Sequence, residues 1–289
     1  MMNINEKKEK RANFVKIYDL VSLNRNISLI QINLLLRTIR NVYEFFLIGQ
    51  YFLTKFSSQR SISSKLTLIT RKALTRQNIN LWIYPSSNEK YTQNFFDQIE
   101  HKILENYTEK DFIIPLGVRA IEFAKKKNMK IIQSFEDLSN SFENSNKIAQ
   151  IIEHGIKNRQ FSSVKMAVYS NKIPNFIATI FPLNQFEFKM ETSQEALEII
   201  ENNLEKVRFF PNFEEFYQTQ IHTYFASSVQ VLLLESQFIV YKNKLIHENT
   251  LLKEIEEKIH HLKTTILKIE RELEIEELNL IKRKPKGVF

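Results

Sequence analysis

Histidine and glutamate side chains give the first indication of whether this 289-residue sequence carries chemistry. His101 and Glu105 lie four residues apart and would share one face of a helix, but no third ligand accompanies them. His260 and His261 are adjacent, so on a helix they would point about 100° apart and could not hold one metal ion together. Glutamates at 270, 272, 274, 276 and 277 spread around a helix in the same way, which is typical of a solvated face. We therefore expect no catalytic residue and no metal site.

Motifs for nucleophiles and nucleotides are also missing. The sequence has no cysteine, which excludes thiol catalysis, disulfides and thiolate metal sites. It has 4 glycines and neither a Gly-x-Gly-x-x-Gly turn nor a Walker A loop. Ser86 and Ser87 lack the flanking glycines of a nucleophile elbow, so a turn at the end of a strand is the better interpretation. We expect no cofactor.

Charge is distributed unevenly along the chain. Lysine and arginine number 41 against 33 acidic residues, a net charge of +8. Residues 1–76 hold 14 basic and 4 acidic residues, so this segment carries +10 and the remainder −2. A basic segment could face phosphate backbones, anionic lipid or an acidic protein, and charge alone does not choose among them.

Membrane insertion is not expected. The apolar stretches at residues 27–36 and 45–53 are interrupted by polar residues and fall short of the roughly 20 that a span requires. Residues 1–11 are highly charged and lack the apolar core of a secretory signal. A cytoplasmic setting is the expectation.

Apolar residues spaced three and four apart predict a long helix from about residue 13 to residue 56. A first seam of aliphatic residues ends at Leu34, and a second begins one residue later, so the stripe moves around the helix. The first seam consists of Leu20, Leu23, Ile27, Ile30 and Leu34. The second consists of Leu35, Ile39, Val42, Phe46, Gly49, Leu53 and Phe56.

A second long helix is predicted after Pro211, to about residue 282. Its apolar seam keeps strict three–four spacing over three heptads, with Glu and Lys at most positions between. The seam consists of Leu252, Ile255, Ile259, Leu262, Ile266, Ile269 and Leu273. A helix of this length outgrows a single globular core and needs a partner along its length. The first helix, running antiparallel to it, is the expected partner.

The middle of the chain alternates short β-rich runs with helical stretches. The predicted strands are residues 79–84, 112–116, 129–132, 164–169 and 176–181, and the predicted helices are 92–107, 118–127 and 147–158. Such alternation favours βαβ units and a mainly parallel sheet. We thus predict an α/β fold in which a long antiparallel coiled coil of the N- and C-terminal helices carries an inserted Rossmann-like α/β domain. The expected divisions are 1–76, 77–206 and 207–289.

Several local sequences, in the same order, resemble the gamma subunit of F-type rotary ATPases, the central shaft. The resemblance covers most of the chain. Its motifs are Leu81-Trp82-Ile83-Tyr84 with Ser86-Ser87, Phe112-Ile113-Ile114-Pro115-Leu116-Gly117-Val118-Arg119, Phe135-Glu136-Asp137-Leu138, Phe210-Pro211-Asn212-Phe213-Glu214-Glu215 and Leu233-Leu234-Glu235-Ser236. The chain departs from the family at Asn88-Glu89-Lys90-Tyr91, where a glycine-rich turn is usual. It departs again at Leu262, Thr265 and Ile266, where the family has an Asn-x-x-Arg-Gln cluster. These departures indicate a divergent paralogue.

The resemblance implies a non-catalytic rotor at the centre of a hexameric ring of alpha/beta-like ATPase subunits. Further stalk subunits would contact the α/β head, and the peripheral complex would lie at the inner face of the cell membrane. Rotation would serve ion pumping or, in some relatives, gliding motility. Basic residues expected to face acidic loops of the ring are Arg25, Arg37, Arg40, Lys55 and Arg60.

Two other functions compete with the rotor. A coiled-coil structural or adaptor protein with an α/β head would share the same architecture. A nucleic-acid-binding protein would use the basic first helix and its aromatics Phe45, Phe46, Tyr51, Phe52 and Phe56. We expect these aromatics to pack against a partner helix instead, and we expect no nucleic acid.

Overall fold

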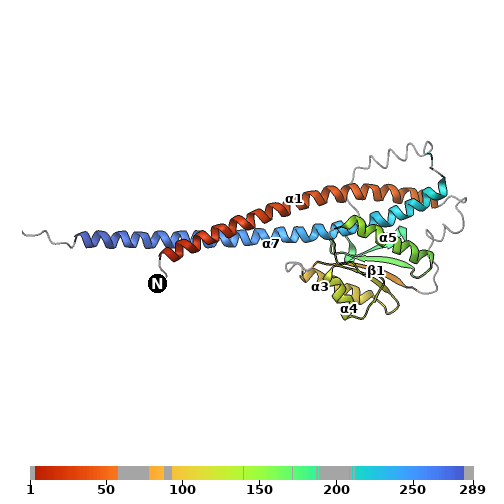
Figure 1. Cartoon of the computed structure of the whole chain (residues 1–289), viewed down its shortest axis with the longest axis horizontal. Coiled ribbons are helices and arrows are strands. Elements are labelled where there is room, and N and C mark those ends of the chain that lie inside the picture. Colours follow the sequence, from red (N-terminus) through yellow and green to blue (C-terminus); the bar gives the residue numbers. More distant parts are fainter. Residues whose placement is uncertain are drawn as a thin grey trace, which may run out of the picture. The chain divides into compact units, whose positions relative to one another are not determined.

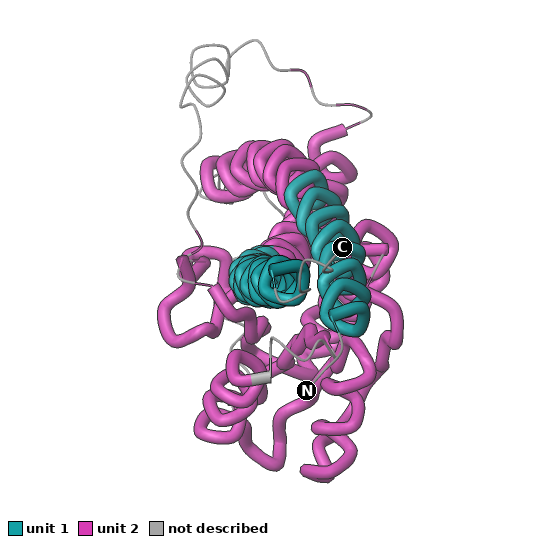
Figure 2. Tube along the Cα trace, turned by 90° about the vertical axis from the view of Figure 1, so that its left-hand side faces the viewer, with its two compact units in different colours: residues 1–31, 242–289 teal, residues 32–241 magenta. Residues whose placement is uncertain are grey.

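The structure is a computed structural model that describes residues 4–57, 78–87, 93–138, 140–170, 172–186, 188, 208, 210 and 212–282. The chain forms two compact units, residues 1–31 with 242–289 (unit 1) and residues 32–241 (unit 2), which Figure 2 shows in different colours. Two long helices contribute to both units: α1 (Ile4–Ser57, 54 residues) and α7 (Phe213–Lys282, 70 residues). Neither contains proline, which would interrupt the hydrogen-bond ladder.

Unit 2 holds a five-stranded sheet in the order β3-β2-β1-β4-β5. The strands are β1 (Asn80–Pro85), β2 (Phe112–Leu116), β3 (Lys130–Ile131), β4 (Ser163–Ala167) and β5 (Ile177–Phe181). The helices between them are α3 (Gln93–Asn106), α4 (Val118–Lys126) and α5 (Ser141–Lys157), followed by the short 3-10 turns η2 (Pro174–Phe176) and η3 (Leu183–Gln185). Four strands are parallel, and β5 is antiparallel to β4. The predicted mainly parallel sheet is confirmed, although β3 is shorter than expected.

The two faces of the sheet are covered by different helices, with α5 on one side and α3 and α4 on the other (Figure 1). Along β1, Leu81 and Ile83 belong to the core that includes α5 and the portions of α1 and α7 in unit 2. Trp82 and Tyr84 belong to the core beneath α3 and α4. All four are 0% exposed, as expected for a central parallel strand buried on both faces.

Long terminal helices pack against each other in both units, so the predicted fold class is confirmed. In unit 2 the Phe46 and Tyr224 rings lie 5.3 Å apart, and those of Phe52 and Phe216 lie 5.7 Å apart. Phe46 and Phe52 therefore pack against α7, as the sequence indicated. The antiparallel direction follows because Phe52, later in α1, meets Phe216, earlier in α7.

Candidate functional site

Ser86 is a structural residue at the junction between β1 and α4. Its hydroxyl accepts a hydrogen bond of 2.7 Å from the Ala120 backbone N–H, in the first turn of α4, and the side chain is 2% exposed. It thereby satisfies one of the free N–H groups at the start of the helix. No base accompanies it within hydrogen-bond reach among the described residues, so the expected strand-end role describes it well.

Aromatic rings occupy the end of the sheet where doubly wound folds usually bind nucleotides. That place lies beyond the carboxyl ends of β1 and β4, where the strand order reverses. Tyr169, which follows β4, contacts the ring of Phe95 at 4.4 Å and stacks on Phe176 at 4.7 Å. Within the described residues this end of the sheet offers rings and no glycine-rich phosphate cradle.

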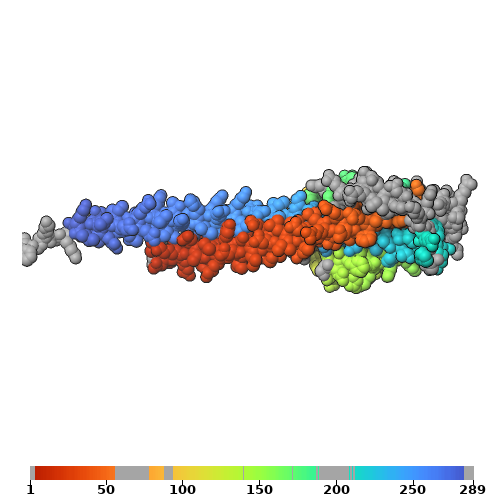
Figure 3. All heavy atoms as spheres, turned by 90° about the horizontal axis from the view of Figure 1, so that it is seen from above, coloured from red at the N-terminus to blue at the C-terminus, as the bar shows by residue number. Residues whose placement is uncertain are grey.

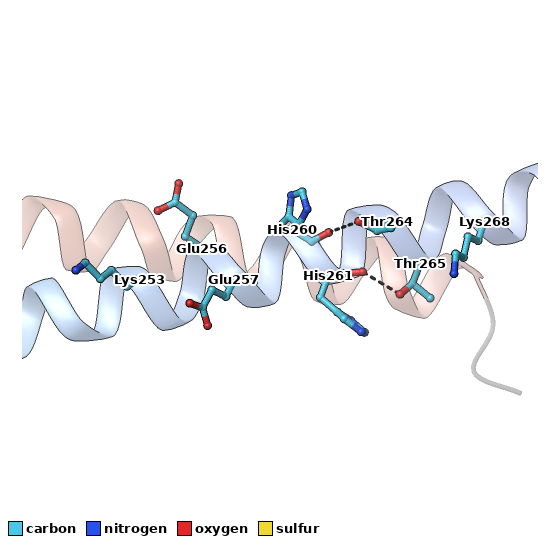
Figure 4. Close-up of a pocket in the computed structure, with 8 residues that line it drawn as sticks. All are labelled: Lys253, Glu256, Glu257, His260, His261, Thr264, Thr265 and Lys268. Carbon is cyan, nitrogen blue, oxygen red and sulfur yellow. Dashed lines mark hydrogen bonds between the residues drawn. The ribbon is translucent and has the colours of Figure 1, made fainter.

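One surface hollow lies on α7 between Lys253 and Lys268, and all eight residues that line it come from this single helix (Figure 4). The Thr264 and Thr265 hydroxyls donate to the backbone carbonyls of His260 and His261, at 3.0 and 2.9 Å. The two histidines point away from each other. Among the described residues no three acidic or histidine side chains could hold a metal ion. The hollow is an open helix surface without convergent ligands.

The helix pair of unit 1 is the feature that can carry function. Lys8 Nζ lies 2.8 Å from Glu270 Oε1, and the Ser28 hydroxyl donates to Glu248 Oε2 at 2.9 Å. Between the first contact and the second, the residue number rises from 8 to 28 in α1 and falls from 270 to 248 in α7. The two helices are therefore antiparallel. The side chains of both helices lie side by side in Figure 3. The arrangement is a two-helix rod segment, with no reaction centre among the described residues.

The first predicted seam of α1 lies on the wrong face. Leu20, Leu23, Ile27, Ile30 and Leu34 are 46–62% exposed. The side chains that turn toward α7 are instead half-buried or buried, and they continue the second predicted seam backward in the same heptad spacing. They are Phe14, Tyr18, Val21, Arg25, Ser28 and Ile32. The four of these residues that lie in unit 1, Leu20, Leu23, Ile27 and Ile30, form an exposed apolar surface, which we call the outer stripe.

Burial along the predicted α7 seam decreases toward its C-terminal end. Leu252, Ile255 and Ile266 are buried, and the seam residues Ile259, Leu262 and Ile269 are half-buried. Leu273 is 45% exposed. It lies beyond Glu270, which pairs with Lys8 close to the first described residue of α1.

The basic residues expected to meet a partner occupy different environments. Arg37, Arg40 and Lys55 are exposed on α1, and Arg60 lies outside the described residues. Arg25 is half-buried in the seam, and its Nη2 donates to Asn26 Oδ1 at 3.1 Å. Its seam position leaves Arg25 poorly placed for a partner, a point that its charge alone did not reveal.

Glu235 is a residue that the sequence marked only as part of a family motif. It is 1% exposed, accepts a 2.7 Å hydrogen bond from the Ser170 hydroxyl, and pairs with Lys172 Nζ at 3.0 Å. These bonds fasten α7 to the segment after β4. The motif residues Ser86 and Gly117 also join elements of unit 2, since the Gly117 backbone N–H donates to the Phe135 carbonyl at 2.7 Å.

Membrane insertion finds no support in the described part of the chain, where no helix has both the length and the apolar character to cross a bilayer.

Comparison with known proteins gives two kinds of relative, and no protein-family model matches the chain. The chain is 31% identical over 204 residues to the uncharacterized protein UU050 of Ureaplasma parvum serovar 3, covering 70% of this chain and 67% of that protein. It is 25% identical over 171 residues to the ATP synthase gamma chain of Mycoplasma capricolum subsp. capricolum. It is also 25% identical over 166 residues to that of Mycoplasma mycoides subsp. mycoides SC. The two gamma-chain matches span 56% and 54% of those proteins, a little over half their length.

Among solved structures, the chain is similar to one in the cryo-EM structure of Euglena gracilis mitochondrial ATP synthase, OSCP/F1/c-ring, rotational state 3. The match has a TM-score of 0.51 and 12% identity, and it covers 99% of this chain and 98% of that one. At this identity the likeness concerns the fold.

Proposed function

This chain belongs to one family with UU050 and is a divergent relative of ATP synthase gamma chains, and from this premise we propose that it is the non-catalytic central-stalk rotor of a rotary ATPase. The observation that supports this role best is the antiparallel pairing of α1 and α7. Two helices packed side by side resist bending better than one, and a heptad seam holds their alignment under torque.

The outer stripe supports a ring partner for this rod. Exposed apolar surfaces of this kind mark interaction sites, and a shaft that turns within a socket needs a face that its own partner helix leaves open. In this role the stripe and the exposed Arg37, Arg40 and Lys55 would face a hexameric ring of alpha/beta-like subunits. Unequal contacts around the ring would bias the binding states of its sites as the shaft turns.

The remaining parts of the proposal concern the wider complex. Further stalk subunits would contact the α/β domain of unit 2, and the assembly would be peripheral, at the inner face of the cell membrane. Hydrolysis or synthesis of ATP in the ring would be coupled to shaft rotation, with ion transport or gliding motility as its output. The chain itself would contribute no group to ATP chemistry.

Purification of the tagged full chain from its own cells, followed by mass spectrometry and cryo-EM, tests the proposal. We expect ring ATPase subunits in fixed ratio, with α1 and α7 inside the ring, and no ATP hydrolysis by the isolated chain. Recovery of the chain without ATPase subunits would contradict the rotor role and favour the coiled-coil adaptor. Retained nucleic acid with a steep salt dependence would favour the third function.

A further inference from the structure

Ser28 and Glu248 place a polar contact inside the apolar seam of unit 1. Ser28 is 0% exposed and Glu248 is 6% exposed, and their side chains are joined by the 2.9 Å hydrogen bond. Glu248 precedes Leu252 by four residues, and Leu252 precedes Ile255 by three, so Glu248 follows the spacing of the seam. Both residues therefore stand where a coiled coil normally has aliphatic side chains.

Stability does not account for this polar layer. Glu248 forms no ion pair with another described residue, although its carboxylate is buried. In the same stretch, Arg25 Nε and Asn243 Nδ2 are buried without a hydrogen-bond partner among the described residues. Buried polar groups that are incompletely paired are less favourable than apolar side chains of similar size.

Alignment of the two helices does account for it. Both seams repeat every seven residues, so sliding α7 by one heptad along α1 would leave most seam positions apolar. Such a slide would place Glu248 against Val21 in one direction and Ser28 against Ile255 in the other. Neither hydrocarbon side chain can donate or accept a hydrogen bond. Only the observed alignment joins the serine hydroxyl to the carboxylate.

The ion pair near the end of the helices cannot select one alignment of α7 along α1 in the same way. Lys8 and Glu270 are 53% and 37% exposed, and exposed ion pairs contribute little because water and salt screen them. We propose that Ser28 and Glu248 are the alignment pair of this coiled coil, fixing which residues of α1 and α7 face each other. The inference concerns the helix pair itself and does not depend on the rotor function.

Spin-label distance measurements on the full chain can test the alignment pair, because the sequence has no cysteine to interfere. Labels are attached through Lys8→Cys and Glu256→Cys, both at exposed positions of unit 1. A slide of one heptad would change their separation by about 10 Å along the helix axis. With Ser28 and Glu248 intact, we expect a single distance.

The informative variant is Ser28→Leu/Glu248→Leu, with Ser28→Ala/Glu248→Leu as a smaller replacement should the first fail to fold. In either variant we expect additional distances shifted by about 10 Å, with a melting temperature equal to or above that of the parent. Glu248→Gln keeps an acceptor for the serine hydroxyl and should keep the single distance.

The matched control is Asn26→Leu/Asn249→Leu, which adds the same apolar side chains at exposed positions next to the pair. It should leave the distance single. A single, unshifted distance in the variants without Ser28 and Glu248 would overturn the proposal, because packing elsewhere would then fix the alignment. Equal broadening in the control would overturn it as well.

Discussion

Asp111 ties together the beginnings of β1 and β2 through hydrogen bonds to three residues. Its carboxylate accepts from the Asn80 backbone N–H at 2.8 Å, the Thr108 N–H at 3.0 Å and the Trp82 indole at 3.1 Å. Burial alone would raise the pKa of Asp111, but the hydrogen bonds outweigh burial and the pKa lies below its ordinary value. The folded state therefore binds this proton more weakly than the unfolded state does.

Stability should consequently fall in acid. The contribution of Asp111 is present above the ordinary aspartate pKa of about 4 and is lost as the pH drops through the lowered pKa of the folded state. Asp111→Asn should reduce the free energy of unfolding at pH 6 by about 2 kcal/mol and weaken its decline below pH 4. Urea titrations followed through Trp82, the only tryptophan, measure both effects. Asp19→Asn on the exposed face of α1 is the control, and an equal loss there would contradict the assignment.

Gly117 is the second residue whose identity the fold demands. Its φ is +91°, and an added Cβ would lie 2.2 Å from the Ser86 backbone oxygen. Gly117→Ala should therefore lower the free energy of unfolding by about 2–4 kcal/mol, measured by urea denaturation. Gly49→Ala, within a helix, is the matched control, because among the described residues the atom nearest to its added Cβ is Gln220 Oε1, at an ordinary contact distance of 3.6 Å. That change should be neutral or stabilise by up to about 1 kcal/mol; similar losses in both variants would contradict the argument.

At the scale of elements, the sequence predicted α7 and the sheet better than it predicted α1. The strand and helix alternation around β1, β2 and β4 is local, and the α7 seam is the only well-developed apolar stripe in its part of the helix. α1 carries two stripes of equal spacing, and the exposed one is the more apolar. The seam that faces α7 is interrupted by Arg25 and Ser28. A prediction based on hydrophobicity therefore assigned the wrong face of α1 to the contact with α7.

Local patterns in the sequence could not predict the contacts between residues that are distant in the chain. The bond between Ser28 and Glu248, and that between Ser170 and Glu235, join residues far apart in the chain. Neither pair has a periodicity that marks its partner. The sequence identified Glu235 and Gly117 only as members of family motifs. The structure gives the physical reason for each, in the buried contacts that they make.

We expect the α7 seam and the outer stripe of α1 to respond differently to an aspartate substitution. Ile266→Asp would bury a carboxylate in the α7 seam, where Ile266 is 6% exposed, and should cost about 3–4 kcal/mol. Loss of helicity on heating, followed by circular dichroism, should begin at a lower temperature. Leu20→Asp, at a residue 62% exposed on the outer stripe, should leave the melting curve unchanged. Equal effects of the two would show that the outer stripe is buried in solution.

At the scale of the whole molecule, the surplus of positive charge in residues 1–76 should guide assembly with an acidic ring. Exposed charges contribute on the order of 0–1 kcal/mol each and act mainly on orientation and association rate. Arg37→Glu/Arg40→Glu should therefore reduce the association rate with purified ring subunits by roughly tenfold or more at low ionic strength. The difference should shrink at high salt, because screening weakens the contacts of the unmodified chain.

A variant with the same change in charge on another surface distinguishes a specific contact of Arg37 and Arg40 from an effect of the net charge of the chain. Lys126→Glu/Lys127→Glu alters two exposed residues at the end of α4, on the α/β domain. If the ring meets α1, this variant should associate at nearly the rate of the parent, measured by stopped-flow fluorescence over a salt series. Equal slowing by both variants would show that net charge alone governs the encounter, and Arg37 and Arg40 would then have no specific place at the ring.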